Sequence, residues 1–100
     1  LIRVPSAIGK YRRVELRSPD PSANTYLAFA LIIYAILDGI QNKTELPAPS
    51  DINLYKADKD ILTSFKQLPE NFKSACTTAA NSDFIRKYIP DAILNIYCNR

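Results

Sequence analysis

Residues 11–17 alternate between charged and apolar side chains, which is typical of a β-strand. In an extended chain, one face would carry Tyr11, Arg13, Glu15 and Arg17, and the other would carry Val14 and Leu16. Residues 1–5 read as an incoming arm that Pro5 ends, and residues 6–10 are short enough for a hairpin loop. The pattern therefore predicts an antiparallel β-hairpin over residues 1–17, with Arg3 close to the charged face.

A strongly apolar segment follows a proline-rich turn. Residues 26–37 are almost entirely apolar, so their side chains would cover most of the circumference of a helix. Asp20 could cap this helix with Pro21 at its first position, and Asn24 is an alternative cap one turn later. We predict a long core helix over residues 20–43 that is buried on nearly all sides. The run is shorter than the ~20 residues that span a bilayer, so no membrane is expected as a partner.

The second half of the chain predicts a loop and several short helices. Residues 44–56 contain two prolines and read as a loop that Leu54 and Tyr55 anchor. Residues 57–100 read as helical, with helices at 58–68, from Pro69, from a cap at Asp83 to Tyr88, and after Pro90. The expected fold class is α+β: an N-terminal antiparallel β-hairpin, then a long buried helix and several shorter helices.

Composition and cysteine content narrow the protein class. Hydrophobic residues make up 47% and charged residues 23%, which is ordinary for a globular protein and unlike a disordered one. The chain has no Met and opens on the apolar sequence LIRVP, so we expect it to be a piece of a longer protein. Cys76 and Cys98 have no His to complete a zinc site. Two scattered cysteines favour free thiols in a reducing, cytoplasmic compartment.

Positive charge is concentrated at the N-terminal end. Residues 1–17 hold five basic residues against the single acid Glu15, whereas the rest of the chain holds eight basic and nine acidic residues. Such a local excess indicates an anionic ligand near the predicted hairpin. An open alternative is a solvated charged edge that discourages strands from aggregating.

The charged face could support phosphoryl transfer. Arginine offers planar, bidentate donors to phosphate and carboxylate, and Glu15 could bind a hard cation such as Mg²⁺ or Mn²⁺. Together they would position and neutralise phosphates that the cation bridges. The other interpretation is a row of salt bridges in which Glu15 only balances its neighbours.

Several motifs lie in one order along the chain: IRVP at residues 2–5, KYRRVELR at 10–17, SPDPSAN at 18–24, YLAFA at 26–30, LDGIQNK at 37–43, NLY at 53–55 and SDFIRKYIP at 82–90. Together they closely resemble the C-terminal part of the catalytic domain of glutamine synthetase, of the bacterial class I type. The resemblance implies that residues 1–100 are a single fragment of that domain, with active-site strands at 1–17.

The resemblance also implies roles for individual residues. Arg3, Lys10 and Arg13 match ATP-binding positions, and Glu15 matches a ligand of Mg²⁺ or Mn²⁺. Arg17 matches a catalytic arginine that binds glutamate and the transferred phosphoryl group. Tyr55 lies where some members carry a tyrosine that is adenylylated, although its surroundings, INLYKA, depart from that subgroup and we expect a buried or loop-anchoring side chain.

The implied activity is ATP-dependent formation of glutamine from glutamate and ammonia through γ-glutamyl phosphate, in a large homo-oligomer such as a dodecamer. The charged face offers one carboxylate, Glu15, and the chain has no His, so the chain alone cannot hold the catalytic metal ions. We therefore expect the isolated chain to be inactive. The alternative is a non-catalytic phosphate-binding, nucleic-acid-binding or scaffold module. Tyr11 is the one aromatic residue in residues 1–17, which disfavours nucleic acid as a partner.

Overall fold

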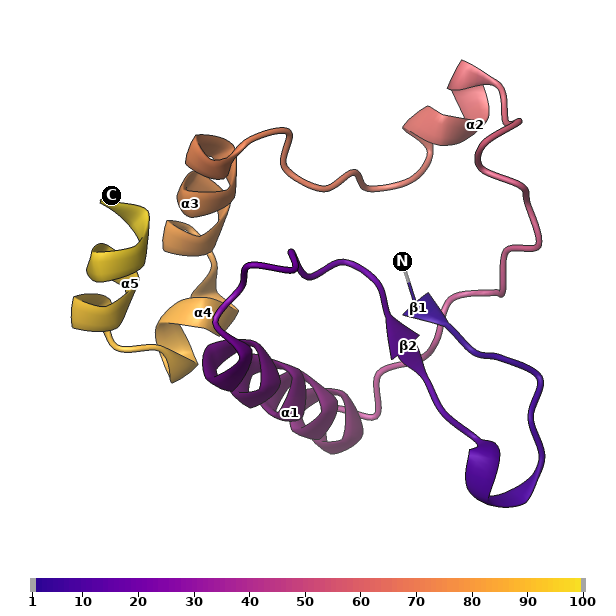
Figure 1. Ribbon diagram of the computed structural model, residues 1–100, viewed down its shortest axis with the longest axis horizontal. Helices are drawn as coiled ribbons and strands as arrows, with labels where there is room; N and C mark the ends of the chain where they lie inside the picture. The colour runs from indigo at the N-terminus through magenta and orange to yellow at the C-terminus, as the bar shows by residue number, and fades with distance from the viewer. Residues whose placement is uncertain (1, 100) are drawn as a thin grey trace.

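The computed structural model describes residues 2–99 and has an α+β composition (Figure 1). Its elements, in chain order, are β1 (Ile2–Arg3), the 3-10 helix η1 (Gly9–Tyr11), β2 (Glu15–Leu16), α1 (Thr25–Gln41), α2 (Lys59–Thr63), α3 (Phe72–Ala80), α4 (Asp83–Tyr88) and α5 (Asp91–Cys98).

The predicted antiparallel hairpin is present, but its strands are short. Ile2 pairs with Leu16 and Arg3 with Glu15. The connection is longer than the five residues expected, because η1 occupies Gly9–Tyr11 and takes Tyr11 out of the strand. Gly9 has a φ of 60°, a left-handed conformation that glycine adopts without steric cost.

Helix α1 begins at Thr25 and not at residue 20. The Oδ1 atom of Asn24 accepts a hydrogen bond from the Leu27 amide at 3.1 Å, which makes Asn24 the cap. Asp20 instead accepts a bond from the amide of Ser22 in the preceding turn. The helix ends at Gln41, where Lys43 adopts a φ of 49° and the Thr44 amide bonds to the Gly39 carbonyl, a Schellman ending.

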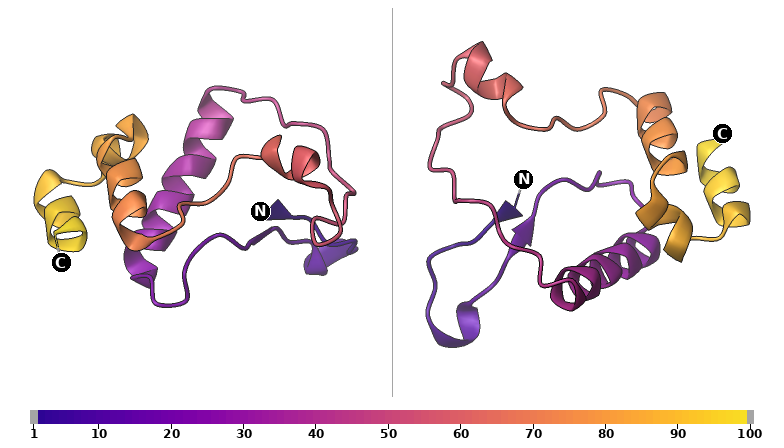
Figure 2. Two further views of the ribbon diagram at one scale, coloured as in Figure 1. Left: turned by 90° about the horizontal axis from the view of Figure 1, so that it is seen from above. Right: turned by 180° about the vertical axis from the view of Figure 1, so that it is seen from behind.

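The expected burial of α1 on nearly all sides is not seen within residues 2–99. The helix packs against α4, where the rings of Tyr34 and Tyr88 stack with centroids 4.1 Å apart. Elsewhere on its surface, Tyr26 and Ile40 are 87% and 68% exposed. The apolar pattern correctly predicted a helix, but burial also needs neighbours on every side, and Figure 2 shows α3, α4 and α5 gathered at one end of α1.

The later helices differ from the predicted ranges mainly at their starts. Helix α2 is a short segment in place of a helix over 58–68. Helix α3 does not start at Pro69: Asn71 caps it, in a capping box with Ser74. Ser82 rather than Asp83 caps α4, since its Oγ accepts from the Ile85 amide at 3.3 Å. The predicted end of α4 at Tyr88 and the start of α5 after Pro90 are confirmed.

The chain is loosely packed. Its radius of gyration is 15.8 Å, against the roughly 13 Å of a compact 100-residue domain. Only Ile89 is buried among the described hydrophobic residues. The hairpin and α2 lie apart from the cluster of α3, α4 and α5 (Figures 1 and 2), and the main contacts of β1 and β2 are with each other. No helix within residues 2–99 combines the length and apolar character needed to cross a membrane.

Candidate functional site

Three arginines surround one carboxylate on the hairpin, and we call this group the Glu15 cluster. Arg3 Nη1 lies 3.1 Å from Glu15 Oε2, and Arg17 Nη2 lies 3.1 Å from the same oxygen. Arg13 Nη2 lies 3.0 Å from Oε1, and its Nε also donates to that oxygen at 3.0 Å. Both carboxylate oxygens are therefore held by guanidinium groups.

The backbone of the hairpin explains this convergence. Arg3 of β1 is the direct cross-strand partner of Glu15 in β2, so their side chains leave the sheet on the same face. Arg13 and Arg17 lie two residues on either side of Glu15 and reach that face by the alternation of an extended chain. The predicted grouping of Arg13, Glu15 and Arg17, with Arg3 nearby, is confirmed.

The cluster keeps Glu15 ionised and leaves a positive surface. Hydrogen bonds from Arg3 and then Arg17 lower the pKa of Glu15 from 4.5 to about 2. The three guanidinium groups exceed the single carboxylate in charge, and their side chains are 51–55% exposed. The face can therefore attract an anion and still present a deprotonated oxygen ligand.

The donor set does not complete a metal site. Within residues 2–99, no three His, Cys, Asp or Glu side chains gather where they could hold a metal ion. Glu15 fits one ligand position of a hard cation, because it is an ionised oxygen donor. Its oxygens now bond to arginines, which is the salt-bridge row of the second interpretation.

Lys10 is not brought into the Glu15 cluster. It lies in η1, at the far turn of the hairpin, with its Nζ atom 5.4 Å from the ring centroid of Tyr11. No ion pair joins Lys10 to Glu15 in the described part of the chain.

Tyr55 is neither buried nor an anchor of its loop. Its side chain is fully exposed between α1 and α2, whereas Leu54 beside it is half-buried. An Asx turn, in which the Tyr55 amide donates to Asn53 Oδ1 at 3.1 Å, presents the tyrosine outward.

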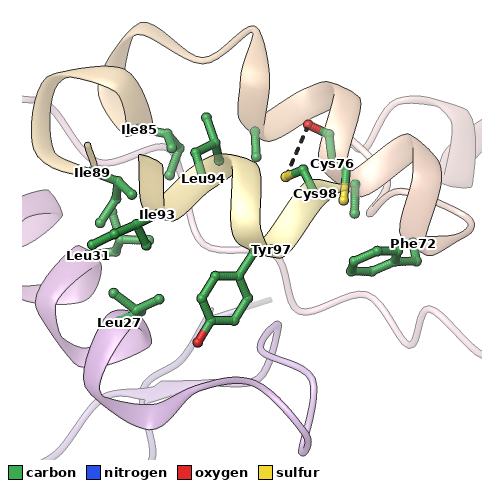
Figure 3. Close-up of a pocket in the computed structure, with 12 residues that line it drawn as sticks. Leu27, Leu31, Phe72, Cys76, Ile85, Ile89, Ile93, Leu94, Tyr97 and Cys98 are labelled. Atoms are coloured by element: carbon green, nitrogen blue, oxygen red, sulfur yellow. Dashed lines mark hydrogen bonds between the residues drawn. The ribbon is translucent and has the colours of Figure 1, made fainter. Parts of the chain in front are cut away.

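Sequence reasoning did not foresee an apolar pocket of about 240 Å³ between α1, α3, α4 and α5 (Figure 3). Its walls are Leu27, Leu31, Phe72, Ala75, Cys76, Ala79, Ile85, Ile89, Ile93, Leu94, Tyr97 and Cys98. A hydrogen bond of 2.9 Å from Asn24 Nδ2 to the Tyr97 hydroxyl links the start of α1 to α5. The apolar spacing on single helices was visible in the sequence, but the shared pocket depends on how the helices meet.

Comparison with known proteins places the whole chain in one family. Residues 1–100 match the family described as glutamine synthetase, catalytic domain. A glutamine synthetase of Thermotoga maritima is 47% identical over 87 residues, covering 85% of this chain and 20% of the relative. One of Staphylococcus aureus is 38% identical over 101 residues, covering 99% of this chain and 23% of the relative.

This chain thus spans about a fifth of the length of those two relatives. The match includes the hairpin that carries the Glu15 cluster and the helices that follow it. The chain belongs to the glutamine synthetase family and is a piece of its catalytic domain.

Proposed function

We propose that this chain supplies one wall of the ATP, metal and glutamate site of an enzyme that forms glutamine from glutamate and ammonia. The observation that carries the proposal is the Glu15 cluster, in which one ionised carboxylate lies among three half-exposed arginines. Family membership supports the same reading and disfavours a nucleic-acid-binding or scaffold module.

The ion pairs around Glu15 are exchangeable on binding. The arginines reach solvent, and ion pairs at half-exposed sites contribute little net free energy. When ATP binds, its phosphate oxygens can accept hydrogen bonds from the guanidinium groups that bond to Glu15 in the free chain. Glu15 would then be free to bind Mg²⁺ or Mn²⁺, together with ligands from outside this chain. A cation held there would supply positive charge that offsets the charge of the phosphates.

The basic residues of the hairpin then bind the two substrates. Arg3 and Arg13 hold ATP phosphates, and Lys10, on the turn, adds a cation at the edge of the nucleotide. Arg17 holds the γ-carboxylate of glutamate and the phosphoryl group during transfer, as a planar donor of paired hydrogen bonds suited to both groups.

Ammonia cannot displace oxide from a free carboxylate, so the γ-carboxylate of glutamate must first be activated. A γ-carboxylate oxygen of glutamate attacks the terminal phosphorus of ATP, the bond to the bridging oxygen breaks, and ADP leaves. Ammonia then attacks the carbonyl carbon of γ-glutamyl phosphate, loses a proton, and expels inorganic phosphate. The arginines stabilise the negative charge that moves through both steps.

We propose a cytoplasmic homo-oligomer, such as a dodecamer, as the complete enzyme. The exposed apolar positions of α1 support the idea that other parts of the protein cover this helix. We also propose Tyr55 as a modification site, which its full exposure supports.

The test is Glu15→Gln in the complete protein that contains this chain. Glutamine still accepts hydrogen bonds but cannot give an anionic ligand, so we expect about 10²–10³-fold lower turnover and a higher Mn²⁺ requirement. Glu45→Gln is the matched control, because Glu45 is an exposed glutamate of the loop after α1. Normal turnover and metal dependence in Glu15→Gln would refute the proposed role of Glu15.

A further inference from the structure

The packing of α3 against α5 brings the two cysteines of the chain together. Cys98 Sγ lies 4.0 Å from the carbonyl oxygen of Cys76, although 22 positions separate the residues in sequence. Both are free, half-buried thiols, and both line the apolar pocket, as Figure 3 shows.

We propose that Cys76 and Cys98 form a reversible disulfide when the protein meets hydrogen peroxide, which ties α5 to α3. The inference is independent of the proposed function, since the Glu15 cluster lies on the hairpin, apart from α3 and α5 (Figure 1). The disulfide would be a modification site in α3 and α5, which have no role in the proposed ligase reaction.

The two thiols have different roles in the reaction. Burial, and then a hydrogen bond with the neighbouring Cys98 thiol, raise the pKa of Cys76. The thiolate is the reactive form, so Cys76 is poorly suited to attack peroxide first. On this ground we assign the first attack to Cys98 and the resolving step to Cys76.

The step balances with hydrogen peroxide as the oxidant. Cys98 Sγ attacks one peroxide oxygen, the O–O bond breaks, and the products are a sulfenic acid and one water. Cys76 Sγ then attacks the Cys98 sulfur, loses its proton and displaces the hydroxyl group as a second water. Two thiols are oxidised to one disulfide while peroxide is reduced to two waters, and a dithiol reductant reverses the change.

The disulfide would close a loop that contains all of α4. Such a bond restricts the unfolded chain and fixes α5 against α3. Since Leu27 and Leu31 of α1 also face the pocket, the bond would hold the α5 wall of the pocket in place opposite these two leucines (Figure 3). The competing explanation is that both thiols only pack as small apolar groups.

The experiment treats the natively folded, complete protein with hydrogen peroxide, blocks remaining thiols and digests with trypsin. Cleavage at the lysines and arginines gives peptides 74–86 and 88–100, each with one cysteine. We expect most of both peptides to appear as one linked species, lighter by two hydrogens than their sum, and dithiothreitol to restore the separate peptides.

A matched variant tests whether the position of the thiol decides the outcome. Cys76→Ser combined with Thr77→Cys moves the thiol to an exposed position of α3 that does not line the pocket. We expect at least tenfold less linked peptide from it. Oxidation of Cys98 to sulfinic acid without linkage in the unaltered protein, linkage only in denaturant, or equal linkage in the variant would each overturn the proposal.

Discussion

Arg3 faces Glu15 across the hairpin, and its guanidinium Nη1 donates to both carboxylate oxygens, at 3.1 and 3.3 Å. This contact makes the largest contribution to the lowered pKa of Glu15. The backbone pairing of two short strands thereby places the arginine that lowers the pKa of Glu15 most.

Arg3→Ala is expected to raise the pKa of Glu15 from about 2 toward 4.5, because the strongest donor to the carboxylate is removed while Arg13 and Arg17 remain. Titration of the Glu15 side-chain carbon by NMR measures the change. Arg12→Ala is the control, since Arg12 is adjacent in sequence to Arg13 but forms no ion pair with Glu15 within residues 2–99. An unchanged Glu15 pKa in Arg3→Ala would contradict this account.

The hairpin is expected to open more readily in acid. A folded-state pKa below the unfolded value means that the stabilisation by Glu15 is fully present above about pH 4.5 and is lost as pH falls toward 2. Amide hydrogen exchange of β1 and β2, corrected for the intrinsic rate at each pH, follows this opening. Glu15→Gln should flatten the dependence in that window, whereas Glu45→Gln should leave it as in the unaltered protein.

Arg17→Lys is expected to lower kcat of the complete enzyme by roughly 10-fold to 100-fold. Lysine keeps the positive charge but cannot form two parallel hydrogen bonds to a carboxylate or phosphoryl group. Steady-state assays of phosphate release separate kcat from the KM for glutamate. Arg86→Lys, at an exposed position of α4, serves as the control and should change neither constant. A normal kcat in Arg17→Lys would remove Arg17 from the catalytic role.

Asn24→Ala is expected to lower the free energy of unfolding by about 0.5–2 kcal/mol, because it removes the side-chain cap of α1. Urea unfolding followed by circular dichroism gives the value. Tyr97→Phe removes the hydroxyl that bonds to Asn24 but leaves the cap, so it separates the two contributions. Equal losses in both variants would show that the link to α5, and not the cap, stabilises this region.

Local patterns predicted what depends on neighbours in sequence. The alternation around Glu15 placed Arg13 and Arg17 beside it, since a two-residue period is a property of any extended chain. Proline marked the start of α5 correctly, yet Pro69 did not start α3, because the side chain of Asn71 provides the cap. The sequence offered Asp20 and Asn24 as caps of α1, and the hydrogen bond from the Leu27 amide shows that Asn24 is the cap.

The sequence by itself therefore determined the family, the charged hairpin and the existence of an apolar helix, because these follow from short-range periodicity and motif. The tertiary structure decided which surfaces of α1 are covered, since burial depends on which other helices pack against α1, and an apolar sequence pattern does not identify them. It also decided that Cys76 and Cys98 meet, because only the packing of α3 against α5 brings residues 22 positions apart within reach.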